Sequence, residues 1–167
     1  MKRGTSAAMV ALTVALAVLA GAAAWLWRHE AAATRRQDRP YRAMQDATQA
    51  ARTDLPVFSN ISAATAAADE ARSRSVLTSG FATTYEPLLA QSAASAAQHG
   101  ATIVEQVQQA EPVSVSGDRA TVRVLVFFTE HATFTDATPA NDRTLQYLLT
   151  MKDVAGTWLV DGADSVT

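Results

Sequence analysis

The 167-residue sequence contains no cysteine, and aromatic residues make up only 7% of it. The lack of cysteine excludes a disulfide framework, a thiolate metal site, a cysteine nucleophile and a diacylglycerol-modified lipoprotein. Hydrophobic residues reach 49%, but much of this fraction is alanine, which buries little surface. A folded core must therefore depend on a small number of large side chains.

Charge is unevenly distributed along the chain. The first 42 residues carry a net charge of +5, and the remainder carries −7. A basic stretch of this kind favours contact with lipid headgroups. The acidic remainder argues against binding to nucleic acid.

Residues 7–27 contain no charged side chain. As a helix, these 21 positions span roughly 31 Å at about 1.5 Å per residue, which matches the hydrocarbon core of a bilayer. Trp25 and Trp27 lie at the exit end, where indole rings favour the headgroup region, and Arg28 ends the apolar run. We therefore predict that residues 1–27 are a short tail and a transmembrane anchor, with these three residues at the membrane interface.

A cleaved signal peptide is the alternative interpretation of this segment. Lys2 and Arg3 form a positive start, and Ala20-Gly21-Ala22 resembles a cleavage site. The apolar run continues past that site to the tryptophans, which favours an uncleaved anchor. Five arginines follow the segment, and by the positive-inside rule they place the C-terminal domain in the cytoplasm.

The rest of the chain divides into a juxtamembrane linker or stalk, residues 28–40, and a soluble domain, residues 41–167. Apolar residues recur at helical spacing over 44–58, and Pro56 predicts that this helix ends or bends near Leu55. A second helix is expected over 63–74. A third follows the break at Ser79 and Gly80, with an interruption at Pro87 and an end at Gly100.

After residue 100 the pattern becomes extended. Two short runs are separated by Pro112, and residues 120–129 alternate with period two, which predicts a strand. Further strands are expected over 145–151 and 158–160, with turns at 116–118 and 153–156 and a loop at 139–142. Helices followed by a meander of strands predict an α+β domain with helices on one face of an antiparallel sheet.

Three local motifs accompany this order of elements: Phe81-x-x-x-Tyr85, Ser-Gly-Asp-Arg119 and Gly-Thr-Trp158-Leu-Val160. With the N-terminal span and the Ala/Arg-rich stalk, they resemble the Mce-associated membrane proteins of actinobacteria, within the NTF2-like and VirB8-like superfamily. The resemblance covers residues 7–166, and the loop 135–143 departs from it. It implies an NTF2-like cone with helices packed on a curved sheet, lying outside the cytoplasmic membrane. It also implies an accessory role in a lipid importer.

Aromatic side chains offer a candidate apolar pocket for a lipid or steroid, and the alternative is that they form the core. The pocket candidates are Phe81, Tyr85, Phe127, Tyr147 and Trp158. His131 with Asp136 is the only acid/base pair considered, and solvent exposure is the competing interpretation. His99 suits a helix end, and Glu105 suits a solubilising role on an edge strand. No motif for a metal or a phosphate is present, so we expect no cofactor.

We therefore expect a non-enzymatic, membrane-anchored accessory protein of a Mce-type lipid or steroid import complex, acting in its assembly or stabilisation. Its expected partners are the cytoplasmic membrane and transporter subunits, with the soluble domain extracytoplasmic. A lipid- or steroid-binding module is the first alternative. An isomerase or dehydratase of the NTF2-like kind is the second.

Overall fold

The computed structural model describes residues 40–135 and 139–166. Residues 40–59 are helical, and we call this segment the N-terminal helix. The predicted anchor, with Trp25, Trp27 and Arg28, lies outside the described residues. Within the described ranges, no helix combines the length and the apolar character that a bilayer crossing requires.

Five strands form one antiparallel sheet in the order β1-β2-β3-β4-β5, so each strand pairs with its neighbour in sequence. The strands are β1 (Ile61–Ser62), β2 (Thr102–Val115), β3 (Thr121–Thr133), β4 (Asn141–Val154) and β5 (Thr157–Ser165). The predicted α+β class with an antiparallel meander is confirmed. The strand predicted over 120–129 is found as β3, four residues longer at its end.

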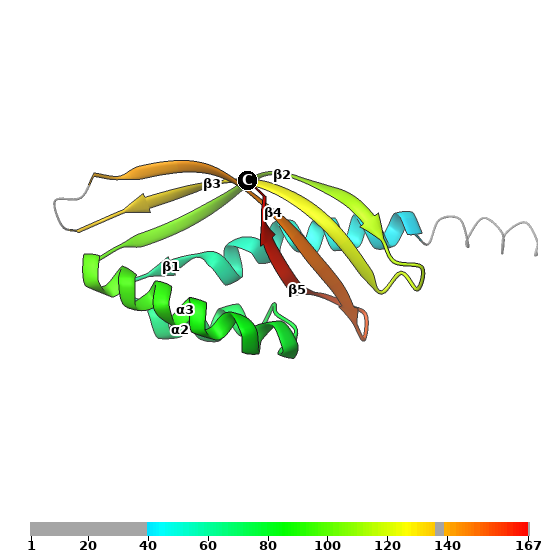
Figure 1. Ribbon diagram of the computed structural model, residues 1–167, viewed down its shortest axis with the longest axis horizontal. Coiled ribbons are helices and arrows are strands. Elements are labelled where there is room, and N and C mark those ends of the chain that lie inside the picture. The colour runs from blue at the N-terminus through cyan, green and yellow to red at the C-terminus, as the bar shows by residue number, and fades with distance from the viewer. Residues whose placement is uncertain (1–39, 136–138, 167) are drawn as a thin grey trace, which may run out of the picture. The chain divides into compact units, whose positions relative to one another are not determined.

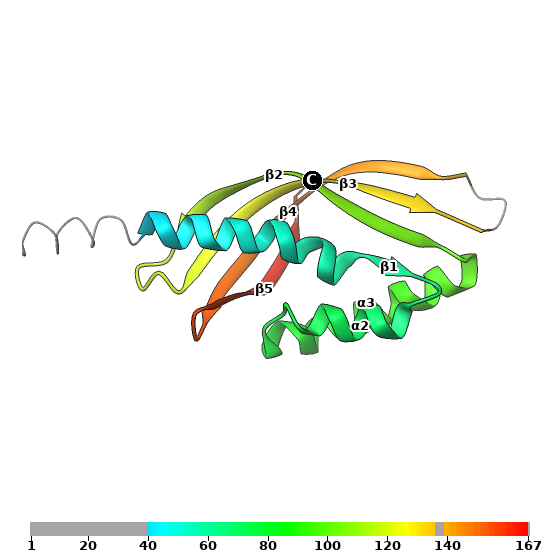
Figure 2. The same cartoon turned by 180° about the vertical axis from the view of Figure 1, so that it is seen from behind.

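Two further helices, α2 (Ala66–Arg74) and α3 (Ser79–His99), precede the long strands. Figure 1 shows α2 and α3 below the curved sheet, on its concave side. Figure 2 shows the N-terminal helix crossing the same side of the sheet. Thr78 caps α3 by accepting a hydrogen bond from the Phe81 amide at 3.3 Å, and Gly100 ends it in the left-handed conformation at φ 58°, as predicted.

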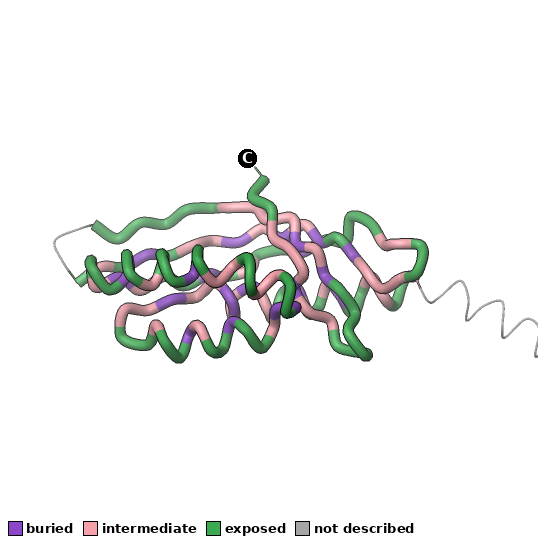
Figure 3. Tube along the Cα trace, turned by 60° about the horizontal axis from the view of Figure 1, so that its bottom comes forward, coloured by how far each residue is buried: buried purple, intermediate pink, exposed green. Residues whose placement is uncertain are grey.

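The core lies between the N-terminal helix and the concave face of the sheet, where Figure 3 marks buried residues along both layers. Ala47, Ala51, Leu55 and Phe58 repeat at helical spacing and are buried. They pack in one cluster with inward-facing residues of the strands, namely Val122, Val124, Val126, Phe128, Leu149, Met151 and Val160. The small alanines of the helix allow it to lie close to the sheet, which suits a core with few large side chains.

Three prolines lie inside elements that they were predicted to interrupt. The N-terminal helix continues through Pro56 to residue 59, and α3 is continuous across Pro87. Pro87 is exposed, so the carbonyl that loses its helical partner can bind water. Pro112 lies within a continuous β2, opposite Val124 of β3 and next to a register shift between Pro112 and Ser114.

Other boundaries differ by a few residues. The helix predicted from residue 63 begins at Ala66, after a turn over residues 63–65. The last strand extends to Ser165 rather than ending at Val160. β1 was not predicted, because two residues carry no periodicity, and it pairs with the start of β2 through Ile61 and Ile103.

Candidate functional site

The concave side of the sheet holds a cavity of about 210 Å³ between α3 and strands β4 and β5. It is lined by Phe58, Phe81, Thr84, Tyr85, Leu88, Tyr147, Ala163 and Ser165. The Tyr85 ring stacks on Phe81 with centroids 5.5 Å apart and meets Phe58 edge-on at 5.6 Å. The walls are therefore mainly aromatic, with a few hydroxyl groups among them.

Three of the five predicted pocket residues, Phe81, Tyr85 and Tyr147, line this cavity. Phe127 does not, because it alternates with the buried Phe128 and so lies on the opposite face of β3. Trp158 also lies outside the cavity lining and packs against the main core. Of two neighbouring residues in a strand only one can face inward, so Phe128 faces the core and Phe127 faces the other side of the sheet.

A polar cluster lies on the same face of the sheet. Glu105 of β2 is the cross-strand partner of Glu130 in β3, which in turn is the partner of Arg143 in β4. Glu105 is only 6% exposed, and its Oε2 lies 2.5 Å from the Ser59 hydroxyl of the N-terminal helix. Glu130 accepts hydrogen bonds from Arg143 Nε at 3.0 Å and from the Nη2 group of the same guanidinium. Asn60, the residue after Ser59, accepts a hydrogen bond from the backbone amide of Glu105 through its side-chain Oδ1 at 2.7 Å.

Burial on this face favours the neutral forms of Glu105, Tyr85 and Tyr147. Burial raises the pKa of Glu105 from 4.5 to about 7, while the Ser59 hydrogen bond lowers it and the Glu130 charge raises it further. Burial also raises the pKa of Tyr85 to about 12, with added effects from Tyr147 and Glu105. The pKa of Tyr147 is raised by burial, then by Glu105 and Glu130. The two phenols therefore stay protonated, as hydrogen-bond donors, throughout the neutral range.

Sequence reasoning missed Glu105 by assigning it to the solvated face of an edge strand. The strand alternation carried the contrary signal, because Ile103, Glu105 and Val107 share one face. Both apolar neighbours are at least partly buried, so the carboxyl between them faces inward as well. No pattern in the sequence indicates that Ser59 and Asn60, at the end of the N-terminal helix, contact Glu105.

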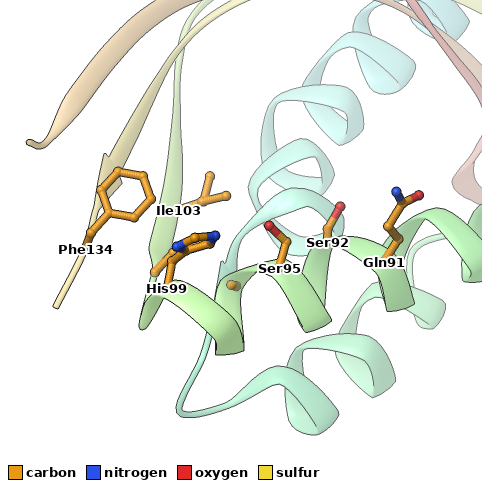
Figure 4. A pocket seen from close by; sticks show the side chains of 8 residues that line it. Gln91, Ser92, Ser95, His99, Ile103 and Phe134 are labelled. Atoms are coloured by element: carbon orange, nitrogen blue, oxygen red, sulfur yellow. The ribbon is translucent and has the colours of Figure 1, made fainter. Parts of the chain in front are cut away.

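A second cavity, of about 310 Å³, lies at the C-terminal end of α3. It is lined by Gln91, Ser92, Ser95, Ala96, His99, Ala101, Ile103 and Phe134. Figure 4 shows the polar side chains in a row along α3, with Ile103 and Phe134 beside the His99 end. His99 is in the last turn of the helix, as predicted. This surface combines one polar and one apolar wall, without a cluster of charge.

An open groove of about 500 Å³ lies between the N-terminal helix and the edge of β2. Arg52 crosses it and donates from Nη2 to the Ala110 carbonyl at 3.3 Å. Tyr41 also lines the groove and is 65% exposed. The groove follows the edge of β2 beyond its short pairing with β1, which involves only Thr102 and Ile103.

The histidine considered for acid/base chemistry lies away from all three cavities. His131 contacts Asp142 through Nδ1, and their side chains are 53% and 64% exposed. Asp136, its predicted partner, lies outside the described residues. Asp161 accepts a hydrogen bond from Thr78 at 2.6 Å at the start of α3. Among the described residues, no group of three or more His, Asp or Glu is arranged to hold a metal ion.

No protein-family model and no curated protein matches the chain. Solved structures do resemble it. CagV of Helicobacter pylori, a VirB8 homologue of a type IV secretion system, aligns with a TM-score of 0.58 at 10% identity, over 71% of this chain and 94% of CagV. An IcmL-like type IV secretion system protein of Legionella pneumophila aligns with a TM-score of 0.59 at 10% identity, over 71% of this chain and 88% of its own.

The described domain has a VirB8-like fold. This finding agrees with the expected fold, in which helices pack on an antiparallel sheet. An identity of 10% establishes the architecture and does not transfer a biochemical role.

Proposed function

We propose that this protein is a membrane-anchored accessory subunit that helps to assemble or stabilise a transport complex in the cell envelope. The observation that carries the proposal is the VirB8-like fold, since CagV and the IcmL-like protein are both type IV secretion system proteins. The uncharged segment 7–27 supplies the anchor. The sequence resemblance favours a Mce-type lipid or steroid importer as the complex, and an extracytoplasmic position for the domain.

The proposed role needs no catalytic step. Anchoring restricts the domain to the membrane that holds its partner, which raises the effective concentration of one for the other. A weak contact between domain and transporter then suffices for stable association. The basic residues between the segment 7–27 and the domain add attraction to anionic lipid headgroups.

Affinity purification of the full chain from detergent-solubilised membranes tests this role. Transporter subunits should be recovered with it, and secretion-system subunits in their place would redirect the proposal to that machinery. A chimera that joins residues 1–39 to an unrelated soluble domain is the matched control, because it keeps the anchor and removes residues 40–167. Equal recovery by the chimera, or recovery of no envelope transport subunit, would contradict the proposal.

Protease accessibility in intact cells tests the position of the domain. We expect cleavage of the C-terminal domain once the outer layers are permeabilised while the cytoplasmic membrane stays intact. Protection until that membrane is lysed would place the domain in the cytoplasm. That result would agree with the arginines after residue 27 and would overturn the importer role as proposed.

A second candidate function is the binding of an apolar ligand in the cavity beside Tyr85 and Tyr147. Its volume of about 210 Å³ is below the roughly 300–1,000 Å³ of typical ligand pockets. It therefore suits a small apolar group or part of an acyl chain better than a whole steroid. Ala163→Leu should fill the cavity and abolish binding of a fluorescent fatty acid. Ala94→Leu, on the exposed side of α3, should leave binding unchanged.

A further inference from the structure

The last turn of the N-terminal helix is fixed to β2 through one residue. The Ser59 hydroxyl oxygen lies 2.5 Å from Glu105 Oε2 and 2.5 Å from the carbonyl oxygen of Leu55. The Asn60 side chain accepts the Glu105 amide at 2.7 Å. Glu105 thus holds the helix end with both its side chain and its backbone.

The number of protons at this junction is limited. A serine hydroxyl carries one proton, and a backbone carbonyl carries none. The Ser59–Leu55 and Ser59–Glu105 oxygen pairs are each 2.5 Å apart, at the short end of the O–H···O range. The single Ser59 proton cannot form both of these hydrogen bonds. The Glu105 carboxyl is the only one of the three groups able to supply a second proton.

We propose that Glu105 is a proton-binding site whose neutral carboxyl donates to Ser59, while Ser59 donates to the Leu55 carbonyl, and that loss of this proton loosens the end of the N-terminal helix. The geometry supports the proposal, because both short contacts are made by the Ser59 hydroxyl and the Glu105 carboxyl in one of them is buried. The raised pKa of Glu105, about 7, agrees with it.

The surroundings of Glu105 disfavour its ionised form. From β3 the carboxyl of Glu130 faces it, and from β4 Arg143 is engaged by Glu130. The phenols of Tyr147 in β4 and Tyr85 in α3 are the other titratable groups near it. None of the ion pairs found between described residues includes Glu105. A negative charge on Glu105 would therefore be repelled by Glu130, and no cation among the described residues forms an ion pair with Glu105 to offset this repulsion.

Deprotonation has a defined structural consequence. Ser59 must turn its single proton from the Leu55 carbonyl to the new carboxylate, so the last helical turn loses a hydrogen bond. The added charge also repels Glu130 across the strands. The helix end, residues 55–60, is then held less firmly as pH rises through about 7. This inference does not depend on the identity of the partner complex.

Carbon-13 NMR of the glutamate carboxyl groups in the full chain, in detergent micelles, tests the proton site. The Glu105→Gln variant identifies the resonance of Glu105 by its disappearance. We expect that resonance to titrate at about pH 7, above the ordinary value of 4.5 for a glutamate. Titration of Glu105 at or below about pH 5 overturns the proposal.

Hydrogen exchange of peptides that cover residues 55–62 tests the coupling to the helix. After correction for the intrinsic exchange rate, protection in the wild type should fall about tenfold between pH 6 and 8. Glu105→Gln should remove this fall, since its amide donates to Ser59 at every pH, and Glu111→Gln should retain it. A constant wild-type protection, or the same fall in Glu105→Gln, overturns the coupling. If Glu105→Gln does not fold, the wild-type exchange and a resonance assignment by sequential NMR decide the matter.

Discussion

Glu105 and Glu130 are direct cross-strand partners on the concave face of the sheet, and Arg143 lies opposite Glu130 on the next strand. Like charges in this position destabilise a sheet unless one of them is neutral or paired. Arg143 pairs with Glu130, whose side chain is 12% exposed, and leaves Glu105 to the Ser59 hydroxyl. The three residues therefore form a ladder in which protonation of one member removes the repulsion.

The first prediction concerns the free energy of unfolding as a function of pH. The folded-state pKa of Glu105 is about 7, above its ordinary value of 4.5, so the folded chain binds more protons between these values. The stabilisation from Glu105 is thus fully present below about pH 4.5 and is lost as pH rises through about 7. Relative to Glu105→Gln, the wild type should lose about 3 kcal/mol between pH 4 and 8.

Denaturant unfolding at a series of pH values measures this loss. Taking the difference between wild type and Glu105→Gln cancels the contribution of other groups, such as Asp54, whose pKa burial raises to about 6. The same comparison in an Asp54→Asn background should give the same difference. Parallel stability curves for wild type and Glu105→Gln would rule out the assignment of this pH dependence to Glu105.

The second prediction compares two neighbouring phenylalanines. Phe128 is fully buried, and its ring centroid lies 4.9 Å from that of Tyr147. Phe127 is half-buried on the other face of β3. Phe128→Ala should cost about 3–5 kcal/mol through lost contacts and the cavity left behind. Phe127→Ala should cost about 1 kcal/mol. Denaturant midpoints at one pH measure both, and equal costs would show that the faces are wrongly assigned.

The long strands could be predicted because their alternation repeats over many residues. β3 has valines at every second position from Val122 to Val126, and all of them are buried. The same alternation places Phe127 on the face opposite to Phe128, and therefore outside the cavity. The pocket residues were predicted from their aromatic side chains. The side of the sheet that each of them faces is set by the strand register.

The prolines and the buried carboxyl were harder to predict, for a common physical reason. A proline removes one amide hydrogen bond, and the element continues where water or neighbouring groups satisfy the acceptor that is left. Pro112 lies next to a register shift in β2, and Pro87 is exposed to water, and both elements continue through them. In the same way, whether Glu105 is solvated depends on the helix end that covers it, through Ser59 and Asn60. These are contacts between segments about 45 residues apart, which local sequence patterns do not encode.

The third prediction concerns Asp69, which is 2% exposed. Its Oδ2 accepts the Ser62 amide at 3.0 Å and the Thr65 hydroxyl at 2.9 Å, and its Oδ1 pairs with Arg72. Asp69→Ala leaves these donors without an acceptor and should cost about 2–3 kcal/mol. Glu70→Ala is the matched control, since that side chain is 42% exposed and should cost less than about 1 kcal/mol. Thermal unfolding of both variants measures the difference, and a small loss for Asp69→Ala would mean that water replaces the carboxylate.

The fourth prediction compares Gly80, in the first turn of α3, with Gly100, which follows its last residue. Gly100 has φ +58°, and an added Cβ would lie 1.8 Å from Thr135 Oγ1, whereas Gly80 has nothing within 4 Å. Gly100→Ala should cost at least about 1–2 kcal/mol, because a side chain is strained in the left-handed region and Thr135 must also shift to admit the Cβ. Gly80→Ala should instead stabilise the chain by about 0.4–1 kcal/mol, since it restricts the unfolded state without strain.

The Gly100 substitution combines two effects that a second variant separates. Adding Thr135→Ala to Gly100→Ala removes the close contact with Oγ1 and leaves the backbone strain. The double variant should therefore recover only the part of the loss that comes from the contact. Gly100→Asn should recover only the part that comes from backbone strain, because asparagine tolerates the left-handed conformation while its Cβ keeps the contact with Thr135. Denaturant midpoints of the three variants decide between the effects. Complete recovery by Thr135→Ala would assign the cost to the contact and not to the conformation of residue 100.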